Sequence, residues 1–222
     1  VTVKRYSDLY DTNFRLNYSI NENLNSIIKI KNNIIRECLK VANINFPIYV
    51  SIVSDVPAGS GLGGSSSVTV GLLNALFCLK GKKISKNKLY KLACKIEIET
   101  LKQPIGKQDQ FPAVYGGMNF IEFKKNDNVI YKRINFKRFN SSLFKNSLLV
   151  WTKITRSATV ELKHQKKNFN KNYKNLLNIK DNLINFKKTT NFKYVDLKLF
   201  GKFISKGWKE KSTLIRKSKL IQ

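Results

Sequence analysis

The sequence predicts a mixed fold of strands and helices built around a sizeable core. Short runs near the start alternate apolar with polar residues, whereas later runs repeat apolar residues at helical spacing. Apolar residues make up 42% of the 222-residue chain, enough for a real core. The longest strongly apolar run, Val68–Leu79, has about half of the roughly 20 residues that a membrane span needs. We therefore expect no membrane-spanning segment.

Three strands and one helix are predicted before the middle of the chain. Val1–Tyr6 and Phe14–Tyr18 alternate in the way that half-buried strands do. Pro47–Ser54 is rich in β-branched and aromatic residues and predicts a third strand. The spacing of apolar residues predicts a helix over Asn21–Val41.

A glycine-rich loop and two helices follow. Pro57–Ser67 carries the glycines and serines, and it runs directly into the apolar segment Val68–Leu79, so we expect a strand, a loop and a buried helix. A second helix is predicted over Lys86–Leu101 by its single apolar stripe. Pro104–Gly117 is predicted to be a loop.

The remaining chain predicts a hairpin, one more strand and a long helix. The hairpin is expected from Met118–Phe123 and Val129–Ile134, the strand from Ser147–Trp151, and the lysine-rich helix from Arg156–Lys188. Between Lys163 and Lys219 there are 17 basic residues against three acidic ones. This shift in composition predicts two domains, residues 1–140 and 141–222.

The chain is strongly basic, with 42 Lys and Arg against 14 Asp and Glu and a formal charge of +28. Such a charge raises the question of a nucleic acid or an anionic membrane as partner. No RNP pattern, zinc knuckle or recognition-helix signature accompanies it. Many residues have A/T-rich codons, which is a sufficient explanation of the composition. We therefore expect neither a nucleic acid nor a membrane as partner.

Cysteine and histidine usage narrow the possible chemistry. The three cysteines form no CxxC pair and cannot complete a disulfide framework, so we expect a cytoplasmic protein. His164 is the single histidine and stands among lysines, as on a solvated helix face. Zinc sites built on several histidines are excluded. The chain starts at Val1 and its one methionine is Met118, so we expect a fragment of a longer protein.

The glycine-rich loop is the strongest functional signal. Backbone N–H groups in such a turn, at the start of a helix, bind phosphate. The dinucleotide fingerprint is formally matched by Gly59, Gly61 and Gly64, but no acidic residue follows at the distance that ribose binding needs. A Walker loop would need a lysine where Ser65 stands. The HRD and DFG signatures of protein kinases are absent.

The loop resembles that of the GHMP kinases, a superfamily of small-molecule kinases. Their phosphate loop reads Pro-x-x-x-Gly-Leu-Gly-Ser-Ser-x-x, and Pro57–Ser67 matches it with Gly64 in place of the first serine. Within the superfamily, the sequences of several segments are most similar to those of sugar kinases acting on D-glycero-D-manno-heptose 7-phosphate. Ile96-Glu-Ile-Glu, Pro104-Ile-Gly-Lys-Gln-Asp-Gln and Tyr115-Gly-Gly-Met-Asn-Phe carry this likeness.

The resemblance implies an α+β fold of two domains: an N-terminal domain like domain 2 of ribosomal protein S5 and a partial ferredoxin-like C-terminal domain. It implies ATP-dependent phosphorylation of a sugar phosphate at the anomeric hydroxyl. Another sugar-1-kinase activity, like that of fucokinase, is the first alternative. A basic nucleic-acid-binding module, suggested by the charge of +28, is the second. The family's N-terminal acceptor motif and its C-terminal glycine-rich motif are not in these residues, so we expect little activity from the chain as it stands.

The resemblance also assigns roles to single residues. It implies Asp109 as the catalytic base and Ser65 with Glu97 as ligands of Mg²⁺. Lys107 and Arg156 are candidates for binding the phosphate of the sugar. ATP and its phosphates are expected to bind the loop residues Pro57, Gly59, Ser60, Gly61, Leu62, Gly63, Gly64, Ser65 and Ser66.

Each of these roles has an alternative. Ser65 could cap the helix, and Asp109 could only form a turn. Glu99 flanks the same apolar stripe as Glu97 and could be the metal ligand instead. Lys107 and Arg156 could be ordinary surface charges.

Overall fold

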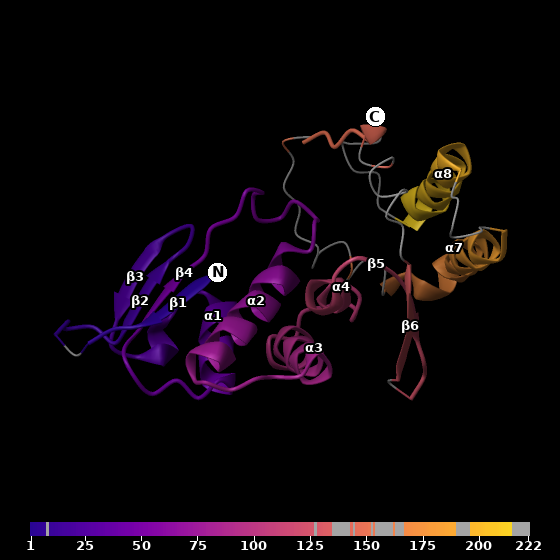
Figure 1. Ribbon diagram of the computed structural model, residues 1–222. Helices are drawn as coiled ribbons and strands as arrows, with labels where there is room; N and C mark the ends of the chain where they lie inside the picture. Colours follow the sequence, from indigo (N-terminus) through magenta and orange to yellow (C-terminus); the bar gives the residue numbers. More distant parts are fainter. Residues whose placement is uncertain are drawn as a thin grey trace. The chain divides into compact units, whose positions relative to one another are not determined.

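The computed structural model describes residues 1–7, 9–126, 128–134, 143, 145–151, 153, 162, 167–189 and 196–214. The chain divides into two compact units, Val1–Gly116 and Gly117–Gln222 (Figure 1). Compact units need not coincide with the domains of a family, so the division into residues 1–140 and 141–222 stays a prediction.

The first unit contains a four-stranded sheet in the order β1 (Thr2–Arg5), β4 (Ile48–Ser51), β2 (Phe14–Asn17) and β3 (Asn21–Leu24). β1 and β2 flank β4, the first antiparallel and the second parallel to it. β3 pairs with β2 in an antiparallel ladder. The three strands predicted in this part of the chain are confirmed.

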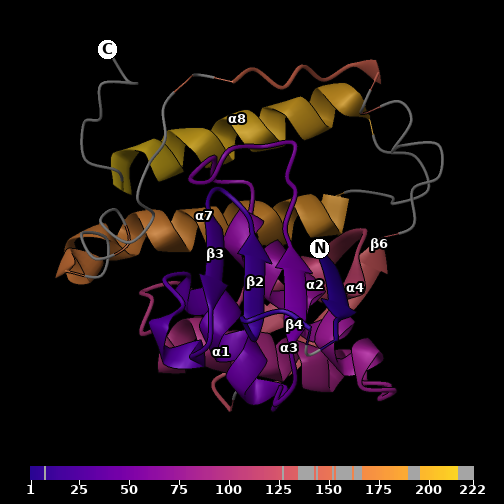
Figure 2. The ribbon, with the colours of Figure 1, turned by 90° about the vertical axis from the view of Figure 1, so that its left-hand side faces the viewer.

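Four helices lie on one side of this sheet: α1 (Asn33–Val41), α2 (Gly64–Leu79), α3 (Lys86–Cys94) and α4 (Gln110–Tyr115) (Figure 2). The alternation along β2 and β4 turns every second side chain toward the helices. A single core results, in which the strand residues pack with the apolar side of α2, namely Phe14, Leu16, Ile48, Val50, Leu72, Leu73 and Leu76. The helix predicted after the glycine loop is thus the central helix of the unit.

The helix predicted over Asn21–Val41 is wrong in its first half. β3 occupies the start of this range, and only a short 3₁₀ turn, η1 (Ile27–Lys29), lies between it and α1. Glu22 of β3 is buried and accepts hydrogen bonds from the Tyr18 hydroxyl at 2.6 Å and from the backbone N–H of Lys31 at 3.1 Å. The helix begins late because the Asn32 side chain caps it, accepting from the N–H of Ile35.

Two further predictions need correction in the region that precedes the second unit. The helix expected over Lys86–Leu101 is α-helical only to Cys94 and continues as a π-helix, η2 (Lys95–Thr100). The expected loop Pro104–Gly117 contains α4. Phe111 drives this short helix, because its ring is buried and stacks on Tyr115 with centroids 4.3 Å apart.

The second unit contains the predicted hairpin, formed by β5 (Met118–Phe123) and β6 (Val129–Ile134). It also contains two helices in contact, α7 (Phe169–Thr189) and α8 (Leu197–Leu214). The second half of the long helix predicted from Arg156 is confirmed as α7, and most of its first half lies outside the described residues. α8 was not predicted, although its less exposed residues recur every three or four positions, as in a helix.

The strand predicted over Ser147–Trp151 is wrong. These residues form neither strand nor helix. Leu148 and Leu149 are exposed by 88% and 80%, and no described strand pairs with them. A β-rich run without a partner for its backbone groups does not become a strand.

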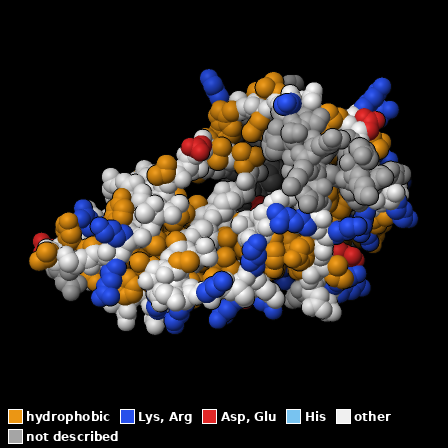
Figure 3. Space-filling view, in the orientation of Figure 1, with side chains coloured by type: hydrophobic (Ala, Val, Ile, Leu, Met, Phe, Trp, Pro, Cys, Tyr) orange, Lys and Arg blue, Asp and Glu red, His pale blue; other side chains and the backbone are white. Residues whose placement is uncertain are grey.

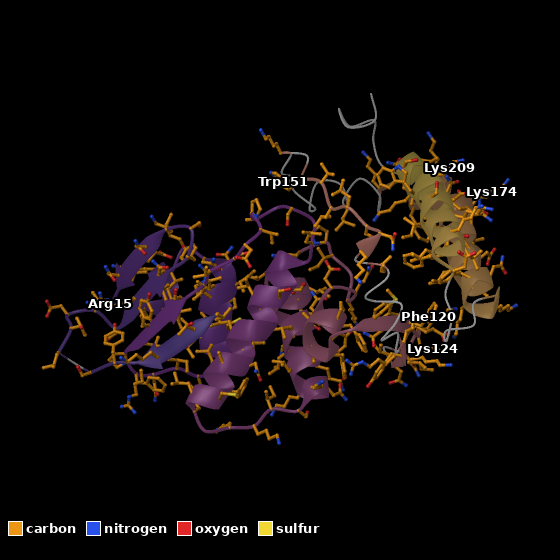
Figure 4. All side chains as sticks on the ribbon, turned by 45° about the horizontal axis from the view of Figure 1, so that its top comes forward. Arg15, Phe120, Lys124, Trp151, Lys174 and Lys209 are labelled. Atoms are coloured by element: carbon orange, nitrogen blue, oxygen red, sulfur yellow. The ribbon has the colours of Figure 1, made fainter. Side chains whose placement is uncertain are left out.

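Many of the exposed side chains in the described part of the chain are basic. Figure 3 shows Lys and Arg spread over the visible face, with few acidic side chains among them. Lys174 and Lys209, on the outside of α7 and α8, belong to this population (Figure 4). No helix in the described part of the chain is both long and apolar enough to cross a membrane.

The three cysteines are all free, but they differ in accessibility. Cys78 is exposed, whereas Cys38 and Cys94 are buried. Burial raises the pKa of both buried thiols, that of Cys94 to about 11 in spite of opposing effects from Tyr90 and Lys107. Only the thiolate reacts with disulfide reagents. At pH 8 we therefore expect Cys78 to react first and the other two only after unfolding; equal rates for all three, followed by mass spectrometry, would contradict this packing.

Candidate active site

The glycine loop leaves the end of β4 and arches to the start of α2 (Figure 2). Three of its glycines have left-handed backbone angles, with φ of +77° at Gly59, +77° at Gly61 and +72° at Gly63. Other residues adopt this conformation only at a cost, so the path of the loop requires glycine at these points. Pro57, Gly59, Gly61 and Leu62 are exposed and Ser60 is half-buried, which leaves the loop open to a ligand.

The first turn of α2 has no side-chain cap. Gly63 is the residue before the helix and has no side chain to satisfy the N–H groups of the first turn. Unpaired N–H groups at the start of a helix attract anions, because they add to the positive end of the helix dipole. The predicted phosphate cradle is therefore geometrically available at Gly63 and Gly64.

Two adjacent serines of this turn face different ways. Ser65 is exposed, and its carbonyl oxygen accepts a hydrogen bond from the Thr69 hydroxyl at 2.9 Å. Ser66 is fully buried, and its hydroxyl donates to Oε2 of Glu97 at 2.9 Å. Ser65 is thus the serine whose hydroxyl lies at the surface beside the loop, and Ser66 connects the loop helix to Glu97.

Glu97 lies in the π-helical segment and is fully buried. Its Oε2 accepts from Ser66 and also from the Gln110 amide nitrogen, at 2.7 Å. Its Oε1 is buried without a hydrogen-bond partner. A buried carboxylate oxygen of this kind is costly unless something else binds it, and π-helical insertions are frequent at functional sites. Glu99, the alternative ligand, is exposed.

Asp109 lies immediately before α4 and is exposed. A Cβ atom built on Gly63 would come within 3.8 Å of Cβ and Cγ of Asp109. The structure thus brings the predicted base beside the glycine that opens the phosphate-loop helix. Asp109 makes no side-chain capping bond to α4, so a capping role does not account for it.

Of the two residues predicted to bind the phosphate of the sugar, the structure describes only Lys107. Lys107 is half-buried two residues before Asp109, and its carbonyl oxygen accepts a hydrogen bond from the Tyr90 hydroxyl at 3.4 Å. Arg156 lies outside the described residues.

The oxygen ligands near the loop suit Mg²⁺. The described residues contain no group of three or more His, Cys, Asp and Glu side chains that could hold a metal by themselves. Mg²⁺ is commonly bound by one or two protein oxygens together with the phosphates of a nucleotide. Glu97, with one oxygen that lacks a partner, and the exposed hydroxyl of Ser65 fit that pattern.

The left-handed glycine next to Asp109 gives a direct test of the loop. Gly63→Ala should lower the free energy of unfolding by about 1–2 kcal/mol, since alanine is strained at positive φ. It should also weaken ATP binding by distorting the cradle. Gly64→Ala is the matched control for stability, because an added Cβ there meets nothing within 4 Å and its backbone is helical. Equal losses of stability for the two substitutions in denaturant unfolding, or unchanged ATP affinity for Gly63→Ala in calorimetry, would contradict this description of the loop.

Comparisons with known proteins find similarity to kinases of the GHMP superfamily. Residues 25–117 match the GHMP kinases N terminal domain. The D-glycero-alpha-D-manno-heptose 7-phosphate kinase of Campylobacter jejuni is 33% identical over 216 residues, which cover 93% of this chain and 62% of that relative. The homoserine kinase of Clostridium botulinum is 33% identical over 99 residues, 44% of this chain and 29% of that relative.

Solved structures show the same fold. The crystal structure of a D-glycero-D-manno-heptose 1-phosphate kinase from Bacteriodes thetaiotaomicron matches with a TM-score of 0.74 at 22% identity, over 95% of this chain and 66% of that one. A mevalonate kinase from Methanococcus jannaschii matches with a TM-score of 0.63 at 21% identity, over 96% and 68%. The chain spans 62% of the length of the heptose kinase relative. The chain has the α+β fold of the GHMP kinases, and its residues 25–117 match the N-terminal domain of that family.

Proposed function

We propose that the protein transfers the γ-phosphoryl group of ATP to the anomeric hydroxyl of a phosphorylated sugar of the heptose 7-phosphate type. The observation that carries the proposal is the position of Asp109 beside Gly63, at the start of the phosphate-loop helix. A carboxylate there is placed to act on a hydroxyl that approaches a phosphate held by the loop. The similarity to a heptose 7-phosphate kinase over 93% of the chain supports the choice of sugar.

In the proposed reaction, Asp109 is the base and ADP is the leaving group. The Asp109 carboxylate accepts the proton of the anomeric hydroxyl while that oxygen forms a bond to the γ-phosphorus. The bond between the γ-phosphorus and the β,γ-bridging oxygen breaks, and ADP leaves with the bond's electron pair. The products are ADP and a sugar that carries a new anomeric phosphate, and the proton remains on Asp109 until solvent removes it.

The loop and its neighbours supply the binding groups. The backbone N–H groups of Gly59–Ser66 are proposed to hold the phosphates of ATP. Glu97 and Ser65 would hold Mg²⁺, which when bound neutralises charge on the phosphate oxygens. Lys107 and Arg156 are proposed to bind the phosphate that the sugar already carries. We also propose that the protein works in the cytoplasm, which the three free cysteines favour.

A substrate panel tests the proposal. ADP release by the full-length protein would be measured with heptose 7-phosphate, fucose, galactose, homoserine and mevalonate. We expect the highest kcat/KM with heptose 7-phosphate. Preference for fucose or another unphosphorylated sugar would instead establish a fucokinase-like activity and leave Lys107 and Arg156 as surface charges.

The same preparation tests whether the charge of +28 serves nucleic-acid binding. Oligonucleotide affinity would be measured at two salt concentrations, because affinity carried by phosphate contacts falls steeply with salt. We expect only weak, salt-sensitive binding. Tight binding that persists at high salt, together with no sugar-dependent ADP release, would replace the kinase proposal with a nucleic-acid-binding function.

A further inference from the structure

We propose that Gln110 is a positioning residue that holds the metal-binding carboxylate and the loop of the catalytic base in one arrangement. This inference rests on the proposed function. Gln110 does not touch the reacting atoms; it acts through Glu97 by a side-chain hydrogen bond and through Asp109 by adjacency in the chain.

The bond between Gln110 and Glu97 is entirely inside the protein. Both side chains have no exposed surface, and Nε2 of Gln110 donates to Oε2 of Glu97 at 2.7 Å. Hydrogen bonds to a charged acceptor are stronger than neutral ones, and burial strengthens them further. Gln110 therefore fixes the position of the carboxylate more firmly than a surface contact could.

Both side chains that donate to Glu97 bond to the same oxygen. The Ser66 hydroxyl and the Gln110 amide occupy Oε2, and Oε1 is left without a partner. This division sets the rotation of the carboxylate, because turning its plane away from this orientation would break both bonds. One oxygen is thus kept available for a cation while the other is held by the protein.

Glu97 is also hydrogen-bonded to both ends of the loop that carries Lys107 and Asp109. Its backbone carbonyl oxygen accepts from the N–H of Gln103 at 3.0 Å, and its side chain accepts from Gln110. Both ends of the segment 103–110 are therefore hydrogen-bonded to Glu97, and Lys107 and Asp109 lie between those ends. Removing the Gln110 bond opens one end of the loop next to Asp109. A misplacement of about 1 Å at a reacting group can cost on the order of 10²-fold in rate.

The packing of α4 does not depend on the amide of Gln110. Phe111 anchors the helix, since it is buried, stacks on Tyr115 and meets the Tyr90 ring edge-on at 5.6 Å. Gln110→Met therefore removes the donor while it keeps the length of the side chain and the anchor of the helix. Gln103→Met is the matched control in the same loop, because Gln103 bonds Glu97 through its backbone N–H, which the substitution retains.

The test compares these variants in the full-length protein. For Gln110→Met we expect kcat to fall by roughly 10–100-fold, the usual effect of losing a residue that orients a metal ligand. The KM for the sugar should stay nearly unchanged, and half-maximal activity should require more Mg²⁺. Calorimetry of ATP binding with and without Mg²⁺ should show that the Mg²⁺-dependent gain in affinity shrinks. Gln103→Met should match the wild type in all three.

A double-mutant cycle with Ser66→Ala adds a readout that a merely structural role would not move. Both side chains act on Oε2 of Glu97, so their effects on the Mg²⁺-dependent affinity should be strongly non-additive. A lower melting temperature for Gln110→Met, with kcat per folded molecule and Mg²⁺ dependence unchanged, would overturn the inference, and so would additive effects.

The failure of the proposed function can be told apart from the failure of this inference. Absence of sugar-dependent ADP release in the wild type would refute the function alone. The calorimetric comparison still decides on Gln110 in that case. A reduced Mg²⁺-dependent gain supports the positioning role, and an unchanged gain overturns it.

Discussion

Replacing Asp109 with asparagine is expected to lower turnover by about 10²–10⁴-fold while ATP still binds with nearly wild-type affinity. Asparagine keeps the size of the side chain beside Gly63 but cannot accept the proton of the attacking hydroxyl. Because Asp109 is exposed and makes no capping bond, the substitution should leave the melting temperature unchanged. Turnover would be measured by sugar-dependent ADP release, and binding by calorimetry.

Asp11→Asn is the control for this substitution. Asp11 is also an exposed aspartate, and it lies in the connection between β1 and β2, in the same unit but outside the loop and its neighbours. We expect it to behave as the wild type. If Asp109→Asn retained normal turnover, Asp109 would be no more than a turn residue and the reaction would need another base.

Glu97→Gln is expected to raise the Mg²⁺ concentration for half-maximal activity by roughly 10-fold or more, because an amide oxygen is a weaker ligand than a carboxylate. Glutamine can still accept from Ser66 and Gln110 through its carbonyl oxygen, so the fold should survive. Alanine would be a poorer choice. It would leave both buried donors without an acceptor, at about 1–3 kcal/mol each.

Glu99→Gln is the matched control, two residues away on the same π-helical segment and exposed. It should leave the Mg²⁺ dependence as it is in the wild type. A larger effect of Glu99→Gln than of Glu97→Gln in a Mg²⁺ titration would transfer the ligand role to Glu99. That result would also leave the orphaned oxygen of Glu97 without an explanation.

The elements that the sequence predicted well are those with a strong local pattern. Strict alternation marked β2, and the long apolar run after the glycines marked α2. The errors have long-range causes. β3 carries no apolar alternation and is a strand because it pairs with β2 and buries Glu22. The run Ser147–Trp151 has the composition of a strand, but pairing decides, and no described strand pairs with it.

In the candidate site, too, the features with a local sequence pattern could be predicted and those set by tertiary packing could not. The glycine loop could be identified from the sequence because its residue types are constrained locally, by positive φ at three glycines. The partnership of Ser66, Glu97 and Gln110 could not, because its members are far apart in the chain and meet only when α2, η2 and α4 are folded together. Burial of Glu97, which distinguishes it from Glu99, also depends on tertiary packing and on the π-helical turn.

The phosphorus NMR spectrum of the reaction product shows directly which hydroxyl of the sugar is phosphorylated. The full-length protein would be incubated with ATP, Mg²⁺ and heptose 7-phosphate, and the sugar would then be isolated. We expect two phosphorus signals from the sugar, the original ester and a new phosphate coupled to the anomeric proton, and no new signal with Asp109→Asn. A new phosphate on any other hydroxyl, or an unchanged sugar alongside turnover of homoserine or mevalonate, would contradict the proposed function.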